Sequence, residues 1–123
     1  MLYALGAVHL LAKPIIGIVG ARNASINGRR FAKRLAAGLG QAGIVVASGM
    51  ARGIDGAAHE GALQTGTVAV LAGGVDNIYP PEHAELYQKI VDAGVILSEM
   101  PPGTVPQASH FPRRNRIVSG LSL

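Results

Sequence analysis

The sequence contains no cysteine, and charged residues make up only 15% of its 123 residues. The missing thiols exclude disulfide bonds, cysteine nucleophiles and cysteine-ligated metal sites, and they fit a reducing cytoplasm. Because apolar residues reach 49%, the chain is expected to bury a hydrophobic core instead of staying disordered. We expect one domain over residues 1–123, since the length allows no more.

Long apolar runs are also missing. The start of the chain, residues 1–12, is apolar but too short to span a bilayer, and it lacks the basic segment that opens a signal peptide. We interpret it as a strand or loop that leads into the first strand of a sheet. The sequence therefore predicts a cytoplasmic protein without a membrane partner.

Acidic residues are absent from the first 54 positions, which carry seven basic residues. All seven acids fall between residues 55 and 112, and three arginines close the sequence. This segregation indicates an electropositive face and a polyanionic partner. The basic residues of the first segment are Lys13, Arg22, Arg29, Arg30, Lys33, Arg34 and Arg52.

The fold class follows from apolar runs that alternate with helical periodicity. The runs are nearly continuous, which is typical of parallel strands covered on both faces. Helices are expected between them. In the first, Phe31, Leu35 and Leu39 form an apolar stripe that Ala32 and Ala36 widen. We predict a Rossmann-like, doubly wound α/β fold with a mainly parallel sheet and helices on both faces. The predicted strands are residues 15–19, 44–47, 67–71 and 95–97, and the later helices begin near Asp55 and Pro80.

The end of the sequence has arginines at helical spacing beside Ile117, Val118 and Leu121, which predicts the first turns of another helix. No strand follows it. We expect these residues to be the N-terminal portion of a larger domain; a small complete domain is the alternative.

Three glycine-containing turns follow the predicted strands, at the edge where doubly wound sheets bind ligands. None matches the dinucleotide fingerprint or the P-loop. Backbone N–H groups near helix N-termini favour a phosphate, so we predict an anion site without a nucleotide cofactor or metal. The turns hold Gly20, Ala21, Arg22 and Asn23; Gly49, Arg52 and Gly53; and Gly73 and Gly74.

Arginine placement supports the anion site. Arg29 and Arg30 lie in the first turn of the first predicted helix, where the helix dipole disfavours cations. Each forms a like-charge pair four residues on, with Lys33 and Arg34, at a cost of roughly 0.2–0.5 kcal/mol per pair. No acid within the helix offsets them, whereas a bound polyanion would. A solvated basic face is the alternative.

The remaining polar and aromatic residues point to no catalytic group. The histidines show no ligand spacing and are interpreted as structural or surface residues. Asp55 is interpreted as the cap of the second helix. Tyr79, Tyr87 and Phe111 are few for a base-stacking platform and are expected in the core.

Taken in order, the turns resemble the DNA-processing protein A family, also called DprA or Smf. The resemblance covers nearly the whole chain from about residue 15. The segments that carry it are IVGARNAS, VVASGMARGIDGAAHEGAL, AVLAGGVDNIYPPEH, ILSEMPPGT and HFPRRNRIVSGLS.

That resemblance implies a non-enzymatic protein that binds single-stranded DNA and helps load a RecA-type recombinase during natural transformation. The family's arginine in a G-S-R turn corresponds to Arg22, with Ala21 in place of serine. Pro81 stands where some members carry a DNA-binding lysine, and His83 where many have asparagine. Arg113, Arg114 and Arg116 are possible further contacts. A homodimer is a possible partner state. In the family, however, dimerisation and recombinase contacts lie largely beyond the segment matched here, so these partners are expected to need that later part.

An enzyme acting on a mononucleotide is the second hypothesis. The layout is also similar to the phosphoribohydrolases of the lysine-decarboxylase-like family, which have glycine-rich turns after the second and third strands. That family depends on a PGGxGTxxE motif, which this sequence lacks. The RGID and FPRRNR segments favour the DNA-processing family.

Overall fold

A computed structural model describes residues 2–106 and 110–122 and contains a five-stranded sheet in the order β1-β5-β4-β3-β2. The four predicted strands are confirmed, with ends shifted by one or two residues, and they run parallel to one another. The strands are β1 (Tyr3–Gly6), β2 (Ile15–Gly17), β3 (Val45–Ser48), β4 (Thr67–Val70) and β5 (Val95–Ser98).

The first strand was not resolved by the sequence pattern. β1 joins the far edge of the sheet, antiparallel to β5, with Tyr3 opposite Ser98 and Gly6 opposite Val95. The chain then crosses beneath the sheet through a short 3-10 helix, η1 (Val8–Ala12), to begin β2 at the opposite edge. The apolar start of the chain is thus an edge strand followed by a crossover whose Leu10 is buried against the sheet.

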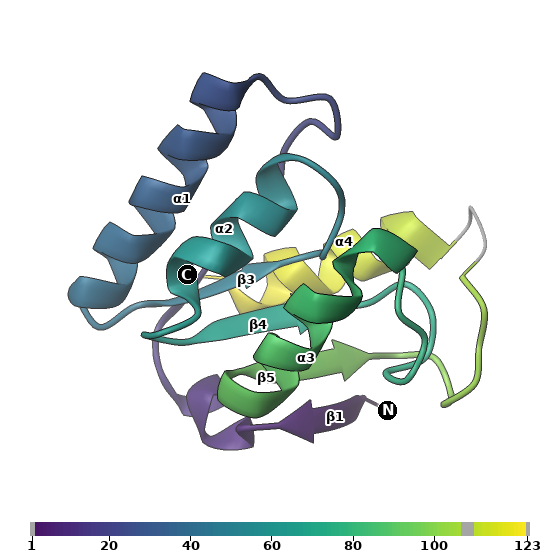
Figure 1. Cartoon of the computed structure of the whole chain (residues 1–123). Coiled ribbons are helices and arrows are strands. Elements are labelled where there is room, and N and C mark those ends of the chain that lie inside the picture. The colour runs from purple at the N-terminus through teal and green to yellow at the C-terminus, as the bar shows by residue number, and fades with distance from the viewer. Residues whose placement is uncertain (1, 107–109, 123) are drawn as a thin grey trace.

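Helices cover both faces of the sheet, as predicted. α1, α2 and α3 lie on one face because each right-handed crossover from β2 to β5 moves in the same direction, and α4 lies on the other (Figure 1). The helices are α1 (Ile26–Gln41), α2 (Ile54–Ala62), α3 (Ala84–Ala93) and α4 (His110–Leu121), and a 3-10 turn, η2 (Pro81–His83), precedes α3.

Alternating strand residues contribute to the hydrophobic cores on the two faces of the sheet. Val45, Val68 and Val95 pack with η1 and α4, whereas Val46 and Ala69 face the three-helix layer. Both sets are fully buried, which explains why the strands are continuously apolar instead of alternating.

The predicted apolar stripe of α1 is confirmed for Ala32, Ala36 and the partly buried Leu39 but is wrong for Phe31 and Leu35. Ala32 and Ala36 are buried, while Phe31 and Leu35 are 60% and 42% exposed. The reason lies in α2, whose Gly61 brings its backbone so close that a Cβ there would collide with the carbonyl oxygen of Lys33. Two helices at that separation admit only small side chains between them, so the larger ones turn outward.

Candidate nucleic-acid interface

The turns after β2, β3 and β4 meet at the carboxyl ends of the strands, and a buried carboxylate joins the first two. Asp55 accepts the backbone N–H of Gly20 at 3.2 Å and of Gly49 at 3.0 Å. Its predicted role as the cap of α2 is wrong. Gly53 occupies the cap position at φ +79°, and no side chain caps the helix. Asp55 lies in the first turn of α2, two residues after Gly53, and fixes the two turns to each other.

The predicted backbone cradle for phosphate is therefore not present at these glycines. Asp55 already occupies the donors of Gly20 and Gly49, and the N–H of Gly74 donates to the carbonyl oxygen of Thr104 at 2.9 Å. The loop around Thr104 also covers Gly73, where a Cβ would meet backbone. The backbone N–H groups of Gly20, Gly49 and Gly74 are therefore already paired within the protein, which leaves side chains as the candidates on which an anion site here is argued.

Arg114 supports the turns from below. It reaches in from α4 and is only 6% exposed. Its guanidinium donates to the carbonyl oxygens of Gly49 and, at 3.4 Å, Val70, and its Nε donates to Asn115 Oδ1 at 2.7 Å. Burial lowers its pKa, with the charge of Arg22 acting in the same direction and Asp55 opposing them. Arg114 is thus a structural cation and not a side chain that projects into solvent.

Arg22 lies at the surface beside two aromatic rings. Its guanidinium carbon is 5.5 Å from the centre of the Phe111 ring, and Arg114 is 5.6 Å from the same ring. Tyr79 packs tilted against Phe111 at 5.9 Å and remains 40% exposed. The core prediction was therefore wrong for Tyr79. It is confirmed for Tyr87, which is buried and donates its hydroxyl to Val75 at 2.6 Å.

A pocket with space for little more than a water molecule, about 20 Å³, opens between these turns and α4. It gathers five of the residues predicted as phosphate contacts: Arg22, Gly49, Arg52, Gly73 and Arg114. Asn77, Tyr79, Pro80, Pro106 and Phe111 complete much of its wall. The pocket combines cationic and aromatic surface at one mouth.

The remaining predicted contacts lie outside this pocket. Arg29 and Arg30 line a neighbouring groove between α1 and α2 that also includes Gly53. There Lys33 lies 3.8 Å from Glu60 of α2, so an acid from another helix offsets part of the charge of α1. Ala21 and Asn23 are exposed beside Arg22, and Arg116 is exposed on α4. The side chain of Arg113 lies outside the described part of the chain.

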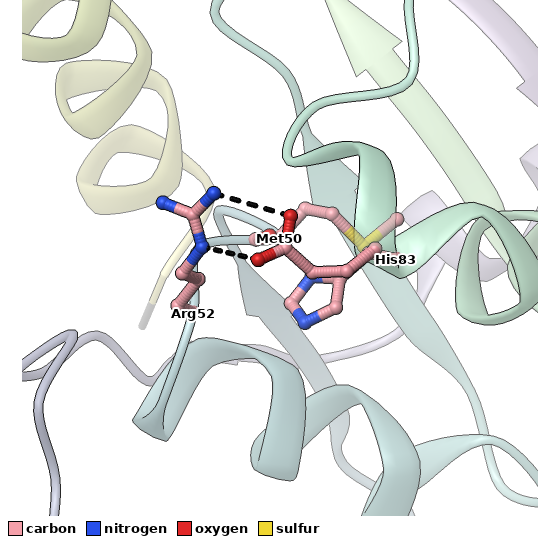
Figure 2. Close-up of polar contacts among 4 residues, drawn as sticks. Met50, Arg52 and His83 are labelled. Atoms are coloured by element: carbon pink, nitrogen blue, oxygen red, sulfur yellow. Dashed lines mark hydrogen bonds and ion pairs between the residues drawn. The ribbon is translucent and has the colours of Figure 1, made fainter.

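Arg52 differs from Arg22 because it is bound to a carboxylate. Its Nε and Nη2 donate to the two oxygens of Glu82 in η2, at 2.6 and 3.1 Å (Figure 2). This hydrogen bond raises the pKa of Arg52 and lowers the pKa of Glu82 to about 2. Next to it, His83 Nδ1 lies 2.9 Å from the carbonyl oxygen of Met50. η2 is thereby tied to the turn after β3 at two points.

A second histidine holds the same turn from inside. His59 is fully buried, and its Nε2 accepts the N–H of Met50, a residue in the left-handed region at φ 61°. Its Nδ1 lies 2.7 Å from Thr67 Oγ1, which donates onward to Val46. The structural interpretation is confirmed for His59. Burial, reinforced by the nearby charges of His83 and Arg114, lowers its pKa to about 3.

Phe111, Tyr79 and Glu82 are residues of this site that the sequence did not reveal. Phe111 is far from Arg22 along the chain, and only the return of α4 across the sheet brings the two together. The FPRRNR segment that contains Phe111 was the one usable indication. Within residues 2–106 and 110–122, no group of histidine and acidic side chains has the arrangement of a metal site.

Known proteins match this chain over nearly its full length. The family model described as DNA recombination-mediator protein A matches residues 1–123. The DNA processing protein DprA of Bacillus subtilis is 43% identical, covering 99% of this chain and 42% of its own length. The Smf protein of Synechocystis is also 43% identical, covering 89% of this chain and 28% of its own. The chain thus spans less than half the length of these relatives.

Solved structures agree with these matches. DNA processing protein A from Helicobacter pylori, whose structure concerns its single-stranded DNA binding mode, has a TM-score of 0.94 at 35% identity and covers 98% of this chain and 56% of that one. The Streptococcus pneumoniae protein has a TM-score of 0.92 at 40% identity, covering 98% and 43%. No helix in the described ranges has the length and hydrophobicity to cross a bilayer. The chain belongs to the DNA recombination-mediator protein A family.

Proposed function

We propose that this chain binds single-stranded DNA at the carboxyl ends of its parallel strands, largely without reading the sequence. The observation that carries the proposal is Arg22, an exposed cation stacked against Phe111 at the mouth of the pocket, with Tyr79 exposed beside them. Proteins that bind single strands combine phosphate-binding cations with aromatic faces on which bases stack. The single-stranded DNA binding of the Helicobacter pylori relative supports the same reading.

In this proposal the side chains divide the work. Arg22 and Arg52 bind phosphates, the exposed face of Tyr79 stacks a base, and Asp55 and Arg114 hold the turns in place from beneath. The groove lined by Arg29 and Arg30 continues the cationic track along α1. Phosphate contacts position a strand without distinguishing its bases, so binding should tolerate changes of sequence.

Substitution of Arg22 tests the proposal. Arg22→Gln removes the phosphate contact but keeps a polar side chain, and we expect about a tenfold loss of affinity because hydrogen bonds to charged groups are the strong ones. Fluorescence anisotropy with a labelled oligothymidylate measures it. Arg34→Gln on α1 makes the same charge change away from the pocket and should have less than about a twofold effect. Equal effects of the two variants would refute the role of Arg22.

We also propose that the site binds without catalysing a reaction. The ionisable groups beneath the pocket are engaged in fixing backbone: Asp55 accepts two N–H groups and His59 one. Incubation with AMP should release no adenine, whereas release would favour the phosphoribohydrolase alternative. The family match supports DNA processing over that alternative.

We further propose that this protein delivers the bound strand to a RecA-type recombinase. We also propose that it associates with itself into a dimer. Both are supported by the family to which the chain belongs. Recombinase assembly on single-stranded DNA, followed with and without this protein, tests the first. Sedimentation velocity over a range of concentrations tests the second.

A further inference from the structure

Glu82 stands in an unusual place for a DNA-binding surface. It is an exposed acid whose carboxylate forms an ion pair with Arg52, one of the two arginines at the mouth of the pocket. The contact is two-pronged, at 2.6 and 3.1 Å, and the two side chains are 55% and 47% exposed. A phosphodiester approaching Arg52 therefore meets a carboxylate already using the guanidinium edge that pairs best with an anion.

The second arginine provides the contrast. Among the described residues, the ion pairs are Lys33–Glu60, Arg52–Glu82 and Lys89–Glu85, and Arg22 takes part in none of them. Arg22 faces an aromatic ring instead of an acid. The pocket mouth thus offers one cation with its charge available and one with its charge neutralised.

The Arg52–Glu82 pair is not needed to hold η2 in place. The ring of His83, the next residue, lies beside Met50 (Figure 2), and its Nδ1 is 2.9 Å from the carbonyl oxygen of that residue. The buried His59 accepts the N–H of Met50. Pro81 and Pro80 restrict the backbone on the other side of Glu82. Exposed ion pairs stabilise folds little, so a purely structural purpose leaves the placement of Glu82 unexplained.

We propose that Glu82 is an internal competitor for the DNA backbone, which limits affinity by occupying Arg52 until a phosphate displaces it. The inference rests on the proposed single-stranded DNA binding and concerns its regulation. When the strand binds, Arg52 exchanges the carboxylate for a phosphate, and Glu82 turns into solvent. Binding through Arg22 alone comes first and is weaker.

Four proteins test the exchange by anisotropy with a labelled oligothymidylate: the unaltered chain, Glu82→Gln, Arg52→Gln and the double variant. Glu82→Gln keeps the shape of the side chain but removes its charge. We expect it to bind about threefold or more tightly, with the slope of log K against log salt steeper by about 0.7, the value for one additional phosphate on a single strand. On the Arg52→Gln background the same change should have no effect.

Glu85→Gln is the matched control. It raises the net charge equally, removes another ion pair, with Lys89 at 3.3 Å, and lies on the next turn of the chain. Its affinity should change less than twofold. An equal gain from both variants, a gain that persists without Arg52, or weaker binding by Glu82→Gln would overturn the competitor role. Arg22→Gln separates the two proposals: if binding depends on Arg22 but not on Glu82, only this inference fails, whereas absence of DNA binding in all variants defeats both.

Discussion

His59 shows how a single buried side chain links the site to pH. It stays neutral in the folded protein because its pKa falls to about 3, whereas an unfolded chain restores a pKa near about 6.5. Between these values the unfolded state binds a proton that the folded state does not. Stability from this residue is therefore complete above the unfolded value and is lost as the pH falls toward 3.

We predict that the free energy of unfolding falls by about 1 kcal/mol between pH 7 and 5.5 because of His59. Urea denaturation at several pH values measures it. His59→Gln keeps an acceptor for the N–H of Met50 but cannot titrate, so its stability should change less over that range. Parallel curves for the two proteins would contradict the assignment.

Among the arginines, position within the fold decides the role. Arg114 is buried under the turn after β3, Arg52 is paired with Glu82, and Arg22 is exposed beside Phe111. These three side chains carry the same charge, yet we expect substitution of Arg114 to impair folding and that of Arg22 to impair binding.

At the scale of elements, the contact between α1 and α2 depends on glycine. A Cβ at Gly61 would collide with the backbone of Lys33, while a Cβ at Gly38 on the outer side of α1 would meet nothing within 4 Å. Both residues lie inside helices, so their intrinsic helix propensity changes alike on substitution by alanine. Comparing alanine substitutions at these two glycines therefore separates the effect of helix packing from the effect of helix propensity.

We predict opposite signs for the two alanine substitutions. Gly38→Ala should stabilise the protein by roughly 0.5–1 kcal/mol, because alanine loses less entropy in a helix. Gly61→Ala should destabilise it by about 1–3 kcal/mol, because α2 must move away from α1. Urea denaturation of each variant gives the comparison, and stabilisation by both would show that the helices are less closely packed.

For the whole molecule, the proposed binding of single-stranded DNA should depend on the layout of charge. The net charge of +4 is distributed so that the turn after β2, the start of α1 and the exposed side of α4 are basic. Complementary fields speed the association of charged partners, and phosphate binding releases counterions from the strand. Affinity should therefore decline as salt is added.

We predict a linear fall of log K with log salt, with a slope of about −2 to −3 if three or four phosphates are bound. Arg22→Gln should reduce the size of that slope by about 0.7, as expected for one lost contact on a single strand. Titrations at four or five salt concentrations provide both values. A slope near zero would show that binding does not depend on the phosphate backbone.

The sequence by itself determined the four parallel strands and the helices that follow them along the chain, because buried parallel strands must be apolar and their crossover helices must show periodicity. It also predicted a phosphate site at the turns after β2, β3 and β4 with Arg22 as its leading contact, and the structure brings residues of all three turns to one pocket. These features depend on neighbours within a few residues along the chain, so they can be predicted from local sequence patterns. Family resemblance placed the same turns in a DNA-processing protein, which the family match confirmed.

Only the tertiary structure decided which polar groups remain available to a ligand. Asp55 looked like a helix cap, yet it closes the backbone donors of Gly20 and Gly49. Arg114 was predicted as a possible DNA contact, yet α4 carries it beneath the turns. Such roles depend on partners tens of residues away along the chain. A buried charge pairs with whichever groups the fold places within hydrogen-bonding distance, and the local sequence does not show which groups those are.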